Sequence, residues 1–458
     1  MNKLEPVILE SRRSKGSSTS NDETSSAKDS QNDTSPTLST LSHDQPLQSY
    51  SVDTSYDPLY AMEYTLTLNQ AEAAAASDPY STVKELVLKV FSRNTTSPPQ
   101  HKYTLDISEL KGGITNVLLH GVYRTAGVTS PIERQFLVRA YGNGTSAIID
   151  RDREFATHLS LYSLGLAPPL YSRFANGLIY GFIPAKSCHY TDLSDPEIIR
   201  GVSNKLAEWH VKLDRDIIQT QIIDTKRKFS SQPGRTPKFA TDIWDVLSQW
   251  IETMPTGVVN VDKADLKREL VWIKETIGNV SPEVVSHCDL LSGNILVPEQ
   301  WEKSDYQTIS SADVSELVSS KAPYSPSQLV TFIDYEYAMP APRGFDLANH
   351  FMEWQGFECK TELIPEPSKS NPVLRYWAFH YLSALSHFSG SSASAHVTDA
   401  DIDSLIQELV SWWGMPGFYW GIWSAIQSSI SDIDFDYKNY ATLRLNEYYA
   451  WKKTYEKN

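Results

Sequence analysis

The sequence predicts an α+β protein with two lobes, a small β-rich N-lobe and a large, mainly helical C-lobe. Its 458 residues exceed one ordinary domain, and 40% hydrophobic with 11% aromatic residues is ample for two lobes around a cleft. Runs rich in β-branched and aromatic residues lie before residue 184, whereas amphipathic helical patterns dominate from about residue 195. We therefore expect the N-lobe over residues 56–183 and the C-lobe over 184–458.

The first 55 residues have a different composition. They are rich in Ser, Thr, Asp, Asn and Gln and carry almost no aromatic residue before Tyr50. Such a segment cannot bury enough apolar surface to offset the entropy lost on ordering. We expect a disordered tail over 1–55, with a phosphorylatable regulatory arm as the alternative, and the folded part starting near Tyr56.

Three strands are predicted in the N-lobe, over residues 103–107, 117–123 and 135–141, after a helical pattern over 71–91. The loop between the first two strands carries a glycine pair, which lets backbone N–H groups approach phosphate oxygens. An ordinary hairpin turn has the same composition. The candidate nucleotide contacts in this loop are Gly112, Gly113, Thr115 and Asn116.

A basic residue near the end of the third strand precedes a helical pattern over 150–164. Kinases pair a phosphate-contacting cation on a strand with a glutamate on the next helix. Arg139 and Glu154 are the candidates, and a surface ion pair is the alternative.

A short apolar strand over 178–184 ends at a proline and predicts a hinge between the lobes. The main chain at Phe182 and Ile183 is the candidate contact for an adenine edge. Beyond it, residues 196–215 and 264–277 read as amphipathic helices. His210, beside a tryptophan in the first of them, is expected to be a core histidine.

The pattern richest in chemistry is His287-x-Asp289-x-x-x-x-Asn294, with Asp334 ending an apolar run about forty residues later. This is the spacing of a phosphoryl-transfer loop and its metal-binding aspartate. Asp289 is the expected base, Asn294 and Asp334 the expected Mg²⁺ ligands, and His287 a brace for the loop. The alternative is a helix cap at Asp289 with an unrelated buried Asn and Asp. Residues 299–327, between the two halves, predict an exposed insertion.

The charge balance and the cysteines bound the partners and the compartment. The net charge of −15 argues against nucleic acid or an anionic membrane as partner and suits a cationic substrate. Cys188, Cys288 and Cys359 show no C-x-x-C spacing, which indicates a reducing cytosol. No apolar run approaches the roughly 18 residues needed to span a bilayer, so we expect a cytoplasmic protein without membrane insertion. A homodimer is left open.

Two later stretches carry a resemblance to a known family. Asp334 is followed by Y-E-Y, then by R-G-F-D-L-A-N-H-F-M-E-W over 343–354, and W-G-I-W-S-A-I-Q over 420–427 precedes I-D-F-D-Y. The combination resembles the choline and ethanolamine kinase family, whose members carry I-D-Y-E-Y, F-D-[IL]-[GA]-N-H-F-x-E-[WF] and W-G-[LI]-W-x-x-x-Q. The resemblance runs with few gaps over 111–449 and misses only the tail and the insertion. It implies a bilobal protein-kinase-like fold and phosphorylation of a small amino alcohol that uses ATP and Mg²⁺.

The resemblance also implies roles for individual residues. Asp289 matches the family's base, Asn294 and Asp334 its Mg²⁺ ligands, and Arg139 and Glu154 its phosphate-binding cation and helix partner. The residues that fall where family members hold the amine are Glu353, Trp420, Trp423 and Tyr440. An ammonium gains about 0.5 to 2 kcal/mol from each aromatic face when it is partly desolvated. Aromatic residues at i, i+3 on a helix are otherwise usually core.

The preferred amine is indicated by V-R-A-Y-G-N-G-T over 138–145 and D-R-D-R-E over 150–154, which are closer to the ethanolamine branch. Trp354 is the choline-like choice, and Cys288 replaces the Asn usual in the family's H-N-D. The resemblance thus implies conversion of ethanolamine to phosphoethanolamine, the first step toward phosphatidylethanolamine. Choline kinase or a dual kinase is the alternative, and a catalytically silent kinase-like scaffold is the remote one.

Overall fold

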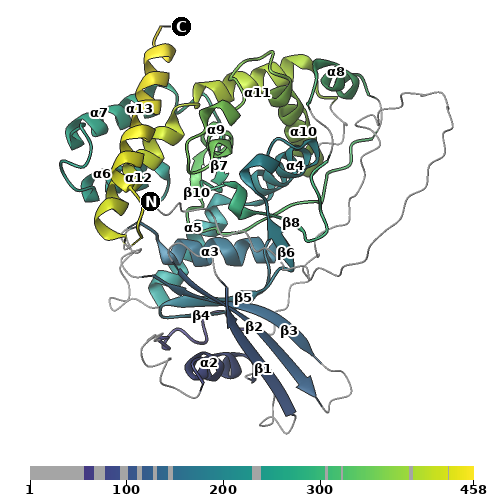
Figure 1. Cartoon of the computed structure of the whole chain (residues 1–458), viewed down its shortest axis with the longest axis vertical. Coiled ribbons are helices and arrows are strands. Elements are labelled where there is room, and N and C mark those ends of the chain that lie inside the picture. The colour runs from purple at the N-terminus through teal and green to yellow at the C-terminus, as the bar shows by residue number, and fades with distance from the viewer. Residues whose placement is uncertain are drawn as a thin grey trace, which may run out of the picture.

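The computed structural model has the two predicted lobes (Figure 1). It describes residues 56–66, 78–92, 102–110, 116–126, 132–142, 148–228, 239–304, 308–320, 323–390, 396–431 and 433–457. A β-sheet with one helix forms the N-terminal end, and a helical mass forms the other end. The predicted α+β class is therefore confirmed, whereas the tail over 1–55 lies outside the described residues.

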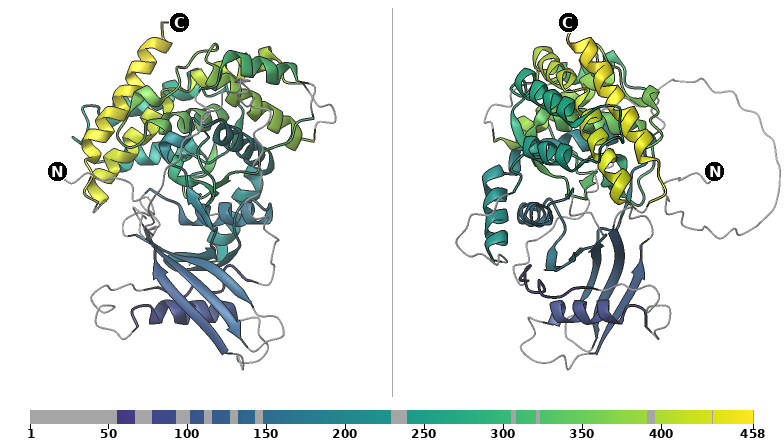
Figure 2. Two further views of the ribbon diagram at one scale, coloured as in Figure 1. Left: turned by 45° about the vertical axis from the view of Figure 1, so that its right-hand side comes forward. Right: turned by 90° about the vertical axis from the view of Figure 1, so that its left-hand side faces the viewer.

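The N-lobe is built on a five-stranded antiparallel sheet of order β1-β2-β3-β5-β4. Its strands are β1 (Lys102–Glu109), β2 (Asn116–Ala126), β3 (Glu133–Tyr141), β4 (Leu170–Phe174) and β5 (Gly177–Gly181). Helix α2 (Ser81–Ser92) lies along one face (Figure 2) and packs apolar side chains such as Val87 and Phe91 against Phe136. The three predicted strands are thus present, each longer than predicted.

Helix α3 (Arg151–Ser163) leads from the sheet toward the C-lobe. Asp150 caps its N-terminus by accepting from the backbone N–H of Asp152 at 3.0 Å and of Arg153 at 3.2 Å. Glu154, in the first turn, is only 3% exposed. The predicted helix therefore exists and turns its glutamate inward.

The C-lobe consists of helices around two small antiparallel sheets, β10-β7 and β6-β8-β9. The strands are β6 (Ala185–Ser187), β7 (Glu283–Ser286), β8 (Ile295–Pro298), β9 (Thr331–Phe332) and β10 (Met339–Pro342). The α-helices are α4 (Pro196–Lys212), α5 (Arg215–Lys228), α6 (Ile243–Thr253), α7 (Lys263–Thr276), α8 (Ser311–Ser319), α9 (Arg343–Met352), α10 (Pro372–Phe388), α11 (Asp399–Ser411), α12 (Met415–Ile430) and α13 (Tyr437–Tyr455). The short 3₁₀ helices are η3 (Tyr190–Asp192), η4 (Ser292–Asn294), η5 (Glu353–Gln355) and η6 (Thr361–Leu363). Their side chains meet in one large apolar core.

Pairing of β8 with β9 brings the two halves of the sequence motif together. Ile295 pairs with Phe332, and the backbone N–H of Ile333 donates to the carbonyl of Asn294 at 3.0 Å. Asn294 and Asp334 therefore lie side by side although 40 residues separate them.

Helices α12 and α13 pack closely because glycines face the contact. A Cβ on Gly417 would lie 2.5 Å from the carbonyl oxygen of Arg444, and one on Gly421 would lie 2.7 Å from Cγ of Leu445. Only glycine fits these positions without a shift of the neighbouring helix. This contact sets where the aromatic side chains of α12 lie relative to α13.

Most of the described residues in the segment over 299–327 are exposed, as expected for an insertion. It contains helix α8, whose Ser310 and Asp313 form a capping box. Trp301, Ile309 and Val314 in the same segment are buried. These three side chains anchor an otherwise largely exposed segment to the C-lobe, where α8 lies against α10.

No helix within the described ranges is both long and apolar enough to cross a membrane.

Candidate active site

The predicted catalytic loop runs from the end of β7 to η4. The side-chain Nδ2 of Asn294 donates to the carbonyl of Asp289 at 2.8 Å and to its carboxylate Oδ2 at 3.0 Å. Because both donors point at Asp289, the amide oxygen of Asn294 is the atom free to face a cation. The predicted base and one predicted metal ligand are thus held against each other.

His287 braces this loop from within the core. It is fully buried, its Nδ1 accepts from the backbone N–H of Asp289 at 3.3 Å, and its Nε2 lies 3.1 Å from the carbonyl of Ile333. Burial lowers the pKa of His287, against the nearby charge of Asp346, so the ring is neutral and donates through Nε2. His287 therefore links the loop to the residue before Asp334.

Asp346, on helix α9, fixes the backbone of the loop. Its Oδ2 accepts from the N–H of His287 and its Oδ1 from the N–H of Cys288, both at 2.9 Å. Burial alone would raise its pKa, but hydrogen bonds from His210 and from the loop lower the pKa of Asp346. His210 Nε2 lies 3.0 Å from Oδ2, and its Nδ1 lies 2.8 Å from the hydroxyl of Tyr381. His210 is the core histidine that was predicted.

Two further side chains of α9 hold the loop. Nδ2 of Asn349 donates to the carbonyl of Cys288, and Nδ1 of His350 lies against the carbonyl of Leu290, each at 3.0 Å. With Asp346 they follow i, i+3, i+4 spacing on one helix face. These three residues were not predicted as part of the site, although they stand in the sequence as D-x-x-N-H over 346–350.

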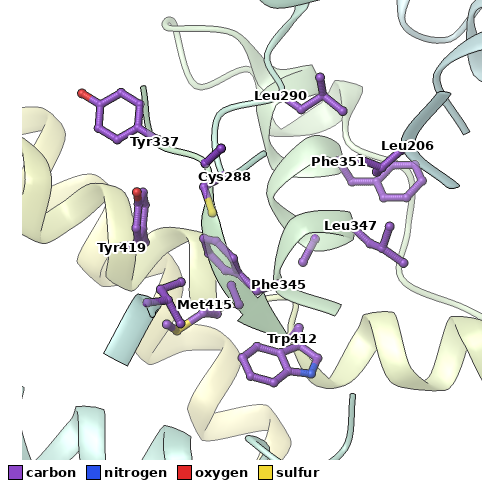
Figure 3. Close-up of a cluster of buried hydrophobic side chains, with 14 of the residues drawn as sticks. Leu206, Cys288, Leu290, Tyr337, Phe345, Leu347, Phe351, Trp412, Met415 and Tyr419 are labelled. Carbon is purple, nitrogen blue, oxygen red and sulfur yellow. The ribbon is translucent and has the colours of Figure 1, made fainter. Parts of the chain in front are cut away.

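Cys288 adopts a left-handed backbone conformation with φ of 64°. Asn reaches this region at lower cost than most residues, which gives a physical reason for the Asn usual at this position. The thiol is fully buried, and Figure 3 shows its sulfur pointing into the apolar cluster with Phe345 and Tyr419. Burial raises the pKa of the Cys288 thiol. The loop is braced through the backbone of Cys288, so the side chain at this position is not needed for it.

A charged cluster joins β3 and α3 to the Asp334 loop. Nη1 of Arg139 donates to Oδ1 of Asp334 at 2.8 Å and lies 3.5 Å from Oε1 of Glu154. Nη2 of Arg139 donates to Glu336, and Nη1 of Arg151 lies 3.0 Å from Oε2 of Glu336. The predicted Arg139–Glu154 pair is present, but Glu336, which the prediction missed, lies closer to Arg139. Glu336 could have been identified as the glutamate of the family motif I-D-Y-E-Y.

Carboxylates crowd the predicted base. Asp289 is 7% exposed, and its pKa is raised well above the usual range, first by burial and then by the charges of Asp334, Glu353 and Glu336. The pKa of Glu336 is also raised by burial, although Arg139 opposes this. Asp334 itself has φ of 65°, a strained conformation held by Arg139 and by the backbone of β9. This concentration of negative charge suits cationic ligands.

The indoles of Trp420 and Trp423 form an aromatic corner with Tyr337. The two indole centroids are 5.4 Å apart and nearly perpendicular, and Trp420 lies 5.7 Å from the ring of Tyr337. Nε1 of Trp420 donates to Oδ1 of Asn349 at 2.7 Å, and Nε1 of Trp423 donates to the hydroxyl of Tyr337 at 2.8 Å. The aromatic corner is therefore hydrogen-bonded to Asn349 of α9 and to the segment after Asp334, and Tyr337 is a member that the prediction missed.

Glu353 and Tyr440, the other two predicted amine contacts, lie around a buried arginine. Burial raises the pKa of Glu353, and the charge of Arg444 opposes it. The guanidinium of Arg444 lies 5.8 Å from the ring centroid of Tyr440, and the ring of Phe435 packs against Tyr440 with centroids 5.6 Å apart. The charge of Glu353 also contributes to the raised pKa of Asp289.

The predicted nucleotide contacts are described only in part. Gly112, Gly113 and Thr115 lie outside the described residues, and Asn116 begins β2. After β5, the N–H of Phe182 donates to the carbonyl of Gln135 at 3.1 Å, and the Phe182 ring lies 4.4 Å from that of His120. Ile183 is buried at the junction of the lobes. Contact of these residues with an adenine stays a prediction.

The donor set beside Asp289 fits Mg²⁺ rather than a protein-saturated metal. No group of three or more His, Cys, Asp or Glu side chains in the described part of the chain is arranged to hold a metal. Mg²⁺ is usually bound by one or two carboxylates with waters and substrate phosphates. One carboxylate, Asp334, and one amide oxygen, Asn294, meet this requirement.

Comparison with known proteins agrees with this geometry. The family model described as choline/ethanolamine kinase matches residues 107–449. Human ethanolamine kinase 1 is 30% identical over 353 residues, which cover 74% of this chain and 66% of that protein, just under two thirds of its length. A probable ethanolamine kinase of Nematostella vectensis is 28% identical over 382 residues, which cover 82% of this chain and 95% of that protein.

Solved structures show the same fold. A Plasmodium vivax ethanolamine kinase superposes with a TM-score of 0.54 at 24% identity, covering 78% of this chain and 86% of that one. A choline kinase of Cryptosporidium parvum gives a TM-score of 0.53 at 18% identity, covering 82% and 96%. With the family model spanning both lobes, from β1 to α13, the chain belongs to the choline/ethanolamine kinase family.

Proposed function

We propose that this chain is an ethanolamine kinase, which transfers the γ-phosphoryl group of ATP to the hydroxyl of ethanolamine and forms phosphoethanolamine, the first step toward phosphatidylethanolamine. The observation that carries the proposal is the position of Asp289. Its carboxylate accepts a hydrogen bond from Asn294, and the charges of Asp334, Glu353 and Glu336 raise its pKa. The curated relatives named ethanolamine kinase support the choice of amine.

Asp289 acts as the general base in this proposal. The hydroxyl oxygen of the amino alcohol attacks the γ-phosphorus while the bond to the β–γ bridging oxygen breaks, ADP leaves, and the hydroxyl proton passes to Asp289. A pKa raised by burial and by neighbouring carboxylates makes Asp289 a stronger proton acceptor once ionised. Asn294 holds the carboxylate in place through Oδ2.

The phosphates lie at the Arg139 end of the site. Arg139 is the proposed phosphate-contacting cation, with Glu154 and Glu336 as its partners. Asn294 and Asp334 are the proposed Mg²⁺ ligands, and Mg²⁺ bound there would neutralise charge on the transferring phosphoryl group. The loop with Gly112, Gly113, Thr115 and Asn116, and the main chain of Phe182 and Ile183, complete the proposed nucleotide site.

The ammonium lies at the aromatic end of the site. Glu353 supplies a partly buried carboxylate, and Trp420, Trp423 and Tyr440 supply aromatic faces. A carboxylate gives a primary ammonium a charge-assisted hydrogen bond, and the aromatic faces attract its charge. We therefore assign these four residues to amine binding.

Choline is the second candidate substrate, because perpendicular indoles beside a carboxylate also suit a trimethylated ammonium. Coupled ADP release with each amine at equal concentration tests the choice. We expect kcat/KM to be higher for ethanolamine, and a clearly higher value for choline would overturn the assignment. A folded chain without amine-dependent ADP release would favour the scaffold alternative.

The two-lobe division at residue 183, a cytoplasmic location and a homodimer are further parts of the proposal. Cys188, Cys288 and Cys359 are all free thiols, which supports a reducing compartment. Sedimentation of the purified chain would distinguish a monomer from a dimer.

A further inference from the structure

Asn349 lies where the proposed base and the proposed amine site meet. Its side chain is fully buried on helix α9. Nδ2 donates to the carbonyl of Cys288 at 3.0 Å, and Oδ1 accepts from Nε1 of Trp420 at 2.7 Å. One amide group therefore joins the residue before Asp289 to an indole of the aromatic corner.

The two partners fix the orientation of this amide. A carbonyl accepts and an indole N–H donates, so the NH₂ must face Cys288 and the oxygen must face Trp420. A flipped amide would set oxygen against oxygen and NH₂ against N–H, and would leave both buried partners unsatisfied. Among uncharged side chains of this length, the bridge requires a primary amide.

Trp423 has no equivalent link to the base. Its Nε1 donates to the hydroxyl of Tyr337, which follows Asp334 on the other catalytic segment. Trp420 alone of the two indoles is therefore hydrogen-bonded to a residue that also bonds the Asp289 loop.

We propose that Asn349 is a positioning residue that sets the Trp420 indole and the Asp289 loop together, so that amine affinity and base placement depend on one side chain. The proposal rests on the proposed function of the site. The indole governs how tightly the ammonium is held, and the Cys288 carbonyl governs where the following residue, Asp289, stands relative to the hydroxyl.

Two substitutions separate the contribution of the Asn349–Trp420 hydrogen bond from that of the Asn349–Cys288 hydrogen bond. N349L removes both hydrogen bonds, so we expect KM for the amine to rise and kcat to fall, each by about tenfold, the range for buried hydrogen bonds. W420F removes the N–H donor and keeps an aromatic face, so we expect the amine KM to rise with a smaller change in kcat. The KM for ATP stays within about twofold in both.

The N349L/W420F double variant completes a cycle. Because both substitutions break the same bond, the double variant is expected to have an amine KM no higher than that of N349L. If N349L does not fold, N349S takes its place in the same cycle.

Asn204 is the matched control. It is also a buried asparagine that bridges, donating to the carbonyl of His380 at 3.1 Å and accepting from the N–H of Ser327 at 2.7 Å, away from the site. N204L should lower the melting temperature as N349L does and leave the amine KM unchanged.

Three results discriminate. If the wild type is active but the effects of N349L and W420F on the amine KM are fully additive, the proposal for Asn349 is refuted and the proposed function stands. The same holds if N349L, like N204L, loses stability without a change in the amine KM. A wild type without amine-dependent ADP release overturns the proposed function, and the proposal falls with it. A coupled cycle with an unaffected ATP KM supports both.

Discussion

At the scale of the residue, Asp289 is placed at an energetic cost. Its folded-state pKa lies above its unfolded value, because burial and three carboxylates disfavour the ionised form. The folded state is therefore favoured when pH is below the unfolded pKa of about 3.9, and this advantage is lost as pH rises through the folded value. At pH 7 an ionised Asp289 lowers the stability of the fold.

D289N should separate stability from activity. We expect turnover to fall by about two to four orders of magnitude, since the base is lost. The free energy of unfolding at pH 7 should rise by about 1–2 kcal/mol, since the buried charge is gone. ADP release measures turnover, and urea unfolding measures the free energy of unfolding. Wild-type turnover in this variant would refute the base assignment.

The pKa shift of Asp346 has the opposite effect on stability from that of Asp289. Its pKa is lowered in the fold, so its contribution to stability is present above the unfolded pKa of about 3.9 and is lost as pH falls through the folded value. D346N should lower the free energy of unfolding by about 3 kcal/mol at pH 7, because a buried hydrogen-bonded charge is removed. The difference in free energy of unfolding between the wild type and D346N should become smaller below pH ~4.

Urea unfolding between pH 3 and 7 measures this difference, with D242N as control. Asp242 also accepts from two backbone N–H groups, those of Trp244 and Asp245, but as the N-cap of α6 outside the site. D242N should cost about 1 kcal/mol and leave kcat unchanged. A positioning role for Asp346 requires kcat to be lower in D346N than in D242N, so equal kcat values in these two variants would refute it.

At the scale of the element, the contact between α12 and α13 positions the aromatic residues of the amine site. Gly417 lies against the carbonyl of Arg444, one turn along α13 from Tyr440. G417A should destabilise the fold by about 1–3 kcal/mol through overpacking and should raise the amine KM, because the helices must separate. S429A, at an exposed position on α12, is the control and should change stability by less than about 0.5 kcal/mol.

Thermal unfolding and amine titration test this prediction. A G417A variant with lowered stability and an unchanged amine KM would show that the helix contact is structural only.

Most of the helices and strands could be predicted from the sequence. The strands at 103–107, 117–123 and 135–141 and the helices at 150–164 and 264–277 follow period-2 and period-3.6 patterns, and all are present. The helix predicted over 196–215 ends at Lys212, and α5 starts at Arg215. The exposed character of the 299–327 insertion followed from its Ser, Asp and Lys content, whereas the buried positions of Trp301, Ile309 and Val314 depend on packing against the C-lobe.

The site residues were predictable where the chemistry requires a particular residue type at a fixed spacing. They were less predictable where tertiary packing determines which side chains meet. The spacing from Asp289 to Asn294 and the later Asp334 follow from local patterns, and the structure brings the three together. Glu336, Asn349 and Tyr337 act through neighbours distant in sequence, so no local period indicated their contacts. Glu336 in particular replaces Glu154 as the nearest partner of Arg139.

At the scale of the whole molecule, the charged cluster is a link between the lobes. Arg139 and Arg151 come from the N-terminal half, and Glu336 comes from the segment after β9. We expect R151Q to raise the KM for ATP by about three- to tenfold, because one of two cations on Glu336 is lost and Arg139 is drawn toward the carboxylates. The amine KM should change little.

R375Q is the matched control, since Arg375 pairs with Asp399 and Asp403 between α10 and α11, wholly within the C-lobe. It should leave the ATP KM unchanged. Initial-rate kinetics with varied ATP measure both variants, and equal ATP KM values in the two would refute a cross-lobe role for Arg151.

The anchoring of the Asp289 loop by helix α9 has a consequence for how this sequence can vary. Asp346, Asn349 and His350 hold the loop through backbone N–H and C=O groups, which every residue except proline carries. The side chain at position 288 is then constrained only by a left-handed φ and an apolar pocket. We therefore expect substitutions at position 288 that fit this φ and this pocket to preserve the loop, provided that helix α9 keeps its three polar residues.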